Sequence, residues 1–239
     1  MLEKIRVWEA VPLKPNARST EGAGLDFTMV SYNVLSQHLL GSMRDLYEGS
    51  DPLHTAWETR GPRLWRQVVR LKPDIICLQE VEEGDIDAFW IPRCREEGLQ
   101  ILYKRRTGPD KKDGCALLYR EARFELCEEA TVEYLQRDCP SLDRDNVGIV
   151  ARLRSDRGDL VVACTHLLYN PRRHDVKLAQ VALLLAEVDR LAWCGRTERH
   201  LPVLLAGDFN LEPFSPVYDF LRHGWLQYGG MSRRQLTPF

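Results

Sequence analysis

The stretch Asp74-Ile75-Ile76-Cys77-Leu78-Gln79-Glu80 decides the fold class of this chain of 239 residues. Residues 75–78 are apolar without interruption, which is typical of a central β-strand that is covered on both faces. A carboxylate next to such a strand is costly to bury unless it is solvated, paired or bound to a metal. The stretch therefore predicts a layered core with Glu80 at its rim, either in an ordinary salt bridge or in a functional site.

Three further predicted strands also end in polar residues. They are residues 27–32 before Asn33, residues 160–164 before Thr165-His166, and residues 201–206 before Gly207-Asp208-Phe209-Asn210. Polar side chains at strand ends, beside loops, commonly build the sites of α/β and layered β enzymes. We therefore expect these side chains to converge on one rim of a sheet.

The remaining elements complete an α/β pattern. We predict strands at residues 115–119 and 146–153, a turn at residues 156–159, and helices at residues 62–71, 175–193 and 215–222, the first of them opened by Pro62. Strands that alternate with helices and then pair suggest two sheets packed face to face with helices outside. No repeat or long linker interrupts the chain, so we predict one domain after a lead-in at residues 1–24.

Composition limits the classes of function. The formal net charge is −2, so RNA binding would need a local basic patch. The seven cysteines form no Cys-x-x-Cys pair, and Cys77, Cys115 and Cys164 lie in apolar runs, which predicts buried free thiols and no zinc site. With no secretory signal and no apolar run of about 20 residues, we expect a protein of the cytoplasm or nucleus without a membrane segment.

The polar strand ends suit phosphate chemistry. Glu80 with an amide such as Asn33 suffices for Mg²⁺, which keeps several waters of its own. Asp208 could orient or deprotonate a water, and Asn210 could donate to a phosphate oxygen, although an Asp-x-Asn turn is the plain alternative. His166 could donate to a phosphoryl oxygen, but a single histidine is more often structural.

Two basic segments could contact a polyanion. Arg172 and Arg173, followed by His174, start the long predicted helix, where cations oppose the helix dipole unless an anion compensates. Asn170 before them is either the N-cap of that helix or an amide donor that faces substrate. The second segment, Lys104-Arg105-Arg106 with Lys111-Lys112, is either a solvated loop or a groove that follows a nucleic-acid backbone.

These motifs resemble the endonuclease/exonuclease/phosphatase superfamily. Its signatures are similar to Ser-Tyr-Asn-Val-Leu-Ser-Gln at 31–37, Cys-Leu-Gln-Glu-Val at 77–81, Thr-His at 165–166 and Gly-Asp-Phe-Asn at 207–210. Longer strings resemble the Angel-type branch of its deadenylase-like group: Lys-Arg-Arg-Thr-Gly at 104–108, Asp-Gly-Cys-Ala at 113–116, Leu-Asp-Arg-Asp-Asn-Val-Gly at 142–148, His-Leu-Leu-Tyr-Asn-Pro-Arg-Arg at 166–173 and Asp-Val-Lys-Leu-Ala-Gln at 175–180. The resemblance covers about residues 25–230.

The resemblance implies a fold, a cofactor and a substrate class. The fold is a four-layer α/β sandwich of two mixed sheets flanked by helices, and the cofactor is Mg²⁺, with Mn²⁺ as the alternative ion. Glu80 would ligate the metal with support from Asn33. His166 and Asn170 would hold the phosphate, while Asp208 and Asn210 would position the attacking water.

The implied substrates are RNA 3′ ends, either a 2′,3′-cyclic phosphate or a poly(A) tail, with no preference for DNA. A lipid or inositol phosphate headgroup is a weaker alternative, since the longer strings match the Angel-type branch. We find no Tyr-x-x-x-x-Leu-hydrophobic segment for the cap-binding translation factor associated with one member of that branch, so that partner is not expected.

The chain departs from the family pattern after residue 210. Family members supply a further Asp and a terminal Ser-Asp-His segment, whereas this sequence ends at Phe239 without either. We therefore expect a domain over residues 25–239 that lacks its C-terminal strands and exposes a sheet edge. Either the sequence is a fragment or splice form, or the enzyme has reduced activity. The alternative function is an inactive module that binds RNA or a protein partner.

Overall fold

A computed structural model describes residues 24–231, and within this range the chain forms two four-stranded mixed sheets. The first sheet has the order β1 (Met29–Asn33), β2 (Ile75–Glu82), β4 (Asp113–Arg120), β3 (Leu99–Arg105). The second has the order β10 (Val203–Asp208), β7 (Gly158–His166), β6 (Val147–Ser155), β5 (Glu125–Glu133). A short pair, β8 (Trp193–Cys194) and β9 (Arg199–His200), stands apart from both.

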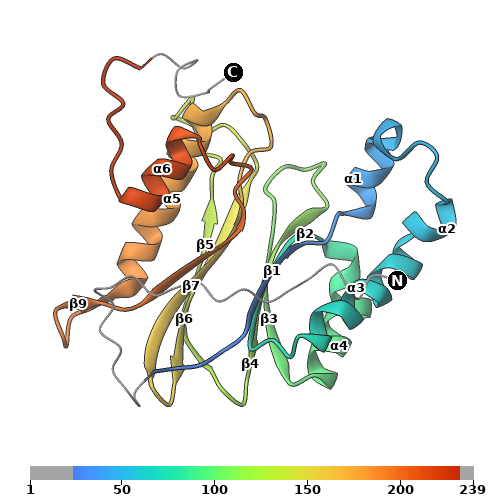
Figure 1. The fold of residues 1–239 in the computed structure, drawn as a ribbon, viewed down its shortest axis with the longest axis horizontal. Helices are drawn as coiled ribbons and strands as arrows, with labels where there is room; N and C mark the ends of the chain where they lie inside the picture. Colours follow the sequence, from blue (N-terminus) through green and yellow to red (C-terminus); the bar gives the residue numbers. More distant parts are fainter. Residues whose placement is uncertain (1–23, 232–239) are drawn as a thin grey trace.

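Helices cover the outer face of each sheet (Figure 1). The helices that precede or cover the first sheet are α1 (Gln37–Ser42), η1 (Arg44–Tyr47), α2 (Pro52–Thr55), α3 (Trp57–Arg70), η2 (Glu83–Asp85), η3 (Ile86–Trp90) and α4 (Ile91–Glu96). The second sheet is covered by α5 (His174–Ala192), against which α6 (Pro216–His223) packs. The predicted four-layer α/β sandwich is therefore confirmed.

Strand β2 shows why the layers form. Its side chains alternate between two cores, because successive residues of a strand point to opposite faces. Ile75 and Cys77 join the core between the two sheets, whereas Ile76 and Leu78 pack towards α3 and α4. The uninterrupted apolar run thus matches a strand that is buried on both faces.

The strand directions bring four carboxyl ends together. β1 runs parallel to β2, and β10 runs parallel to β7, while the other pairs in both sheets are antiparallel. β1 and β10 are the neighbouring edge strands of the two packed sheets (Figure 1). The ends of β1, β2, β7 and β10 therefore meet at one rim of the sandwich.

Some predicted bounds were wrong, and two strands of the main sheets and the short β8–β9 pair were missed. The first long helix begins at Trp57, so Pro62 lies inside it; the Trp57 ring packs on Phe89 and Trp90, which helps to stabilise the additional turn. β10 begins two residues later than predicted and extends to Asp208. β3 and the glutamate-rich β5, each at a sheet edge, were missed because both contain several polar or charged residues.

Other expectations concern the cysteines, membrane segments and the lead-in. Cys77, Cys115 and Cys164 are buried and free, as predicted. Among residues 24–231, no helix combines the length and the apolar character needed to cross a bilayer. The lead-in at residues 1–24 lies almost wholly outside the described residues, so its boundary stays a prediction.

Candidate active site

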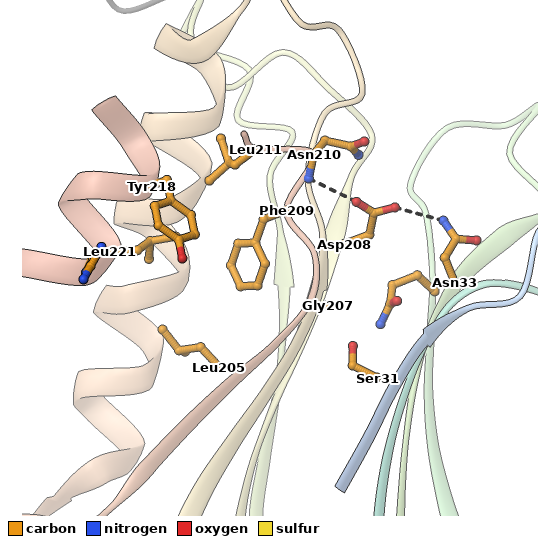
Figure 2. Close-up of a pocket in the computed structure, with 12 residues that line it drawn as sticks. Ser31, Asn33, Leu205, Gly207, Asp208, Phe209, Asn210, Leu211, Tyr218 and Leu221 are labelled. Atoms are coloured by element: carbon orange, nitrogen blue, oxygen red, sulfur yellow. Dashed lines mark hydrogen bonds between the residues drawn. The ribbon is translucent and has the colours of Figure 1, made fainter. Parts of the chain in front are cut away.

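Four strand ends deliver the predicted polar side chains to one place. Asn33 is the last residue of β1, Glu80 lies near the end of β2, and His166 and Asp208 end β7 and β10. Figure 2 shows Asn33 and Asp208 facing each other across the space between the sheets, with Asn210 beside Asp208. Residues from opposite ends of the sequence thus form one cluster.

The Asn33 amide joins two carboxylates. Its Nδ2 donates to Glu80 Oε1 over 2.8 Å and to Asp208 Oδ2 over 3.0 Å. Its Oδ1 accepts from the backbone N–H of Leu35 over 2.9 Å, which fixes the orientation of the amide group. Glu80 and Asp208 therefore face a common point, as expected for groups that act on one substrate.

Glu80 has the surroundings of a cation ligand. It is only 9% exposed, and no ion-pair partner for it occurs among the described residues, so the alternative of an ordinary rim salt bridge is not supported. Its Oε2 accepts from the backbone N–H of Ser36 over 3.0 Å, and each carboxylate oxygen keeps capacity for a further partner. A buried carboxylate of this kind favours a bound cation.

Backbone geometry at Glu80 is unusual for a strand. Its φ is +62°, and the pairing of β2 with β4 shifts register between Gln79 and Val81. Such a bulge re-aims a side chain, and positive φ at a residue other than glycine costs about 1–3 kcal/mol. The fold thus carries local strain where Glu80 turns toward Asn33.

Asp208 is held by a tight turn. Its Oδ1 accepts from the backbone N–H of Asn210 over 3.0 Å, and Asn210 has φ +49°. The Asp-x-Asn turn is therefore present, and the role of Asp208 and Asn210 in a site stays a prediction. The turn occupies one oxygen of Asp208 and leaves Oδ2 directed at Asn33, 3.8 Å from His166 Nε2. Next to it, Gly207 has φ +142°, and a Cβ there would overlap the carbonyl of Thr165.

His166 and Asn210 are anchored through backbone groups. The carbonyl of His166 accepts from Asn146 Nδ2 over 3.1 Å, and the His166 side chain is 13% exposed. Asn210 Nδ2 donates to the carbonyl of Leu167 over 3.0 Å. One amide proton of Asn210 is therefore committed to the fold, and the other can still serve a ligand.

A polar layer beneath the site was missed by the sequence reasoning. Lys177 on α5 is 1% exposed, and its Nζ donates to the carbonyl of Asn210 over 2.6 Å. One turn later, Gln180 accepts from the backbone N–H of Leu168 over 3.0 Å and donates to Asn146 Oδ1 over 3.4 Å. The available signal was these two polar residues, three positions apart, within the apolar stripe of the helix.

The charge of Lys177 matters to this layer. Burial lowers the pKa of its ammonium group, and the carboxylates of Glu212 and Asp208 oppose that shift. Its positive charge lies behind the turn that holds Asp208. Lys177 therefore positions the turn and supplies a cation to the rear of the site.

We expect Lys177→Met to reduce kcat by about tenfold or more and to change KM less. The reason is that the carbonyl of Asn210 loses its partner and the Asp208 turn loosens. The free energy of unfolding should fall by about 1–3 kcal/mol. Steady-state kinetics and urea titration measure the two effects. The control is Lys72→Met, at an exposed lysine after α3. Equal loss in both variants, or full activity in Lys177→Met, would contradict the positioning role.

Residues at the start of α5 lie differently from the expectation. Asn170 is exposed, and its Oδ1 accepts from the backbone N–H of Arg172 over 2.9 Å. The N-cap is Arg173, without a side-chain cap bond, so the N-cap prediction for Asn170 was wrong. Arg173 pairs with Asp175 over 2.9 Å, and burial lowers the pKa of His174. The helix itself thus supplies an anion for Arg173.

The second basic segment is largely paired. Lys104 and Arg105 end β3 instead of forming a loop, and Lys104 bonds to Glu133. Arg105 lies 3.5 Å from Glu83, and Arg106 lies 3.5 Å from Asp113. Carboxylates therefore neutralise much of this patch, and contact of these three side chains with RNA stays a prediction.

A cavity of about 650 Å³ opens beside the carboxylates. Asn33, Asp208 and Asn210 line one side of it, and Phe209 and Tyr218 lie on the other, apolar side (Figure 2). Among the described residues, no cluster of three or more His, Cys, Asp or Glu side chains could hold a metal. A metal here would therefore rely on Glu80, whose carboxylate Asn33 holds in place, and on its own waters.

Comparison with known proteins identifies similar chains. Residues 30–238 match the sequence model of the Endonuclease/Exonuclease/phosphatase family. Protein angel homolog 1 from Rattus norvegicus is 43% identical over 241 residues, which is 95% of this chain and 35% of the relative. Protein angel homolog 2 from Danio rerio is 43% identical over 211 residues, or 86% of this chain and 37% of the relative. The chain thus spans little more than a third of these relatives.

Solved structures agree with this similarity. The crystal structure of ANGEL2, a 2′,3′-cyclic phosphatase, in complex with adenosine-2′,3′-vanadate superposes with a TM-score of 0.84 at 39% identity, covering 88% of this chain and 61% of that one. The human Nocturnin catalytic domain with bound sulfate superposes with a TM-score of 0.67 at 25% identity, covering 81% and 68% of the two chains.

Proposed function

Because this chain belongs to the endonuclease/exonuclease/phosphatase family, we propose that it hydrolyses phosphate esters at the 3′ ends of RNA. The first candidate substrate is a terminal 2′,3′-cyclic phosphate, since the similar ANGEL2 is described as a 2′,3′-cyclic phosphatase and was solved with an adenosine-2′,3′-vanadate. Removal of 3′ nucleotides from poly(A) is the second. The observation that carries the proposal is the single amide of Asn33 that bonds to both Glu80 and Asp208.

The proposed cofactor is Mg²⁺, with Mn²⁺ as the alternative. Glu80 would hold the ion with support from Asn33, because Glu80 is a buried carboxylate without a cation partner in the described part of the chain. When bound, the ion would neutralise charge that develops on the phosphate oxygens. Mg²⁺ usually takes only one or two protein carboxylates, which fits a site without a larger acidic cluster.

The side chains around the phosphate have separate proposed roles. Asp208 Oδ2 would accept the proton of the attacking water, because the turn with Asn210 occupies its other oxygen. The water oxygen would form a new bond to phosphorus as the bond from phosphorus to one ribose oxygen breaks. That ribose oxygen would take a proton from solvent, and Asp208 would return its proton to solvent. His166 would donate to a phosphate oxygen as charge develops there.

The proposed contacts from Asn170, Arg172 and Arg173 require the substrate to reach the start of α5. Asn170 and Arg172 are exposed there, whereas Arg173 is engaged by Asp175. Asn170 and Arg172 are therefore the better placed to meet a phosphate, and Arg173 would have to exchange its carboxylate partner.

Turnover of a 3′-terminal 2′,3′-cyclic phosphate tests the proposal. We expect the cyclic phosphate ring of an oligoadenylate with that end to be opened in the presence of Mg²⁺. EDTA should reduce the rate of ring opening by about a thousandfold. Chromatography of the products measures ring opening, and poly(A) shortening is followed in parallel. Retained oligonucleotide binding with no metal-dependent turnover of either RNA would refute the hydrolase and leave the binding module as the better account.

A further inference from the structure

A second cavity of about 330 Å³ adjoins Asn33, which also lines the first. It therefore lies next to the residue whose amide bonds to Glu80 and Asp208. Its walls come from the end of β1 and from α3, with Arg60, Arg63 and Gln67 on the helix side. Substrate bound at the carboxylates would therefore have this cavity as a neighbour.

The charge of this cavity is positive on its helix side. Arg60 donates to the carbonyls of Val34 and Leu35 over 2.9 and 2.7 Å, which ties the residues after Asn33 to α3. Its bonds among the described residues go to carbonyl and amide oxygens, so no carboxylate contact neutralises it there. The nearby Glu80 and Glu82 act on it only at a distance.

Arg63 is the accessible cation of the cavity. It is exposed, one turn from Arg60, and it makes no hydrogen bond or ion pair within the described part of the chain. His54, also in the lining, lies 3.6 Å from the carboxylate of Asp51. A guanidinium group with free donors beside a reaction centre is suited to bidentate binding of a phosphate group.

We propose that this second cavity binds a backbone phosphate of the RNA strand next to the reacting 3′ end, with Arg63 as its main donor. This inference rests on the proposed function, because it takes the 3′ end to lie between Glu80 and Asp208. Phosphate contacts dominate the affinity of proteins for single strands without reading their sequence. The cavity would therefore make the enzyme prefer an oligonucleotide over a mononucleotide that carries the same end.

The test compares two substrates with the same cyclic end. One is adenosine 2′,3′-cyclic monophosphate, and the other is a five-nucleotide oligoadenylate with a 3′-terminal 2′,3′-cyclic phosphate. We expect Arg63→Gln to lower the ratio of kcat/KM for the oligonucleotide to kcat/KM for the mononucleotide by about tenfold, since one charged contact is lost only on the longer substrate. Gln67→Glu should lower the same ratio by placing a negative charge in the lining.

Arg66→Gln is the matched control. Arg66 is an exposed arginine of the same helix that does not line the cavity, and its Nε bonds to the carbonyl of Pro62. The ratio should stay within about twofold of the wild-type value. An unchanged ratio in Arg63→Gln, or an equal loss on both substrates, would overturn the proposal.

Binding separates this proposal from the proposed function. Fluorescence anisotropy of the labelled oligonucleotide in EDTA does not depend on turnover. We expect Arg63→Gln to weaken binding and to reduce the slope of log K against log salt by about 0.7, the value for one phosphate contact on a single strand. If the wild-type protein turned over neither substrate, the proposed hydrolase would fail, and the anisotropy of Arg63→Gln would still decide the role of the cavity.

Discussion

Glu80→Gln is expected to reduce kcat/KM by about a thousandfold or more, because the proposed cation would lose its charged ligand. A glutamine also presents an N–H₂ group where Glu80 now accepts from both Asn33 Nδ2 and the backbone N–H of Ser36. Two donors cannot bond to each other, so one contact must break. Rapid-quench kinetics with saturating Mg²⁺ measures the loss.

Two controls make the Glu80 result specific. Glu83→Gln makes the same chemical change just beyond β2, on a side chain that is 65% exposed, and should leave kcat/KM within about twofold. Mg²⁺ should raise the melting temperature of the wild-type protein and of Glu83→Gln but not that of Glu80→Gln. An ion stabilises the folded state only if it binds to it, and Glu80→Gln would lose the proposed ligand. A normal metal-induced shift in Glu80→Gln would contradict the assignment of Glu80 as the ligand.

The sequence was informative where a strand is buried on both faces. β2 and β7 have long apolar runs, and their ends place Glu80 and His166 where the pattern predicted. β3 and β5 were missed because an edge strand need not be apolar, and both contain several polar or charged residues. Local pattern thus identified the central strands and the apolar edge strands β1 and β10, but not the opposite edges, β3 and β5.

Of the candidate site, the sequence pointed to the residues at the strand ends and not to those that support them. Asn33 and Asp208 were found because a polar residue after an apolar run stands out, and the structure joins them directly. Lys177 and Gln180 were missed as supports because a polar residue on a helix is normally solvent-exposed, and their burial depends on loops distant in sequence. Pairing across such distances cannot be inferred from local spacing.

The basic residues show the same dependence on tertiary structure. Lys104 and Arg106 suggested a patch for RNA because they are adjacent in the sequence, but the fold places Glu133 and Asp113 against them. Arg63 drew no attention in the sequence, yet it remains accessible beside Asn33. The position of a cation relative to folded carboxylates decides whether it can meet a phosphate, and that position is a tertiary property.

Asp208→Asn is the second change for which we expect a large effect, a fall in kcat of about a thousandfold with little change in oligonucleotide binding. The substitution keeps the size of the side chain and removes the group that accepts the proton of water. Asparagine can still accept from the backbone N–H of Asn210 through Oδ1, so the turn should persist. Its Nδ2 would then face the Asn33 amide, which donates to Oδ2 in the wild type, and that contact would be lost.

Asp189→Asn is the matched control for this change, since Asp189 is 72% exposed and contacts His200 far from the carboxylates. Single-turnover kinetics separates the chemical step from binding, and thermal unfolding checks that both variants remain folded. Full activity in Asp208→Asn would show that Asp208 serves only to hold Asn33 in place.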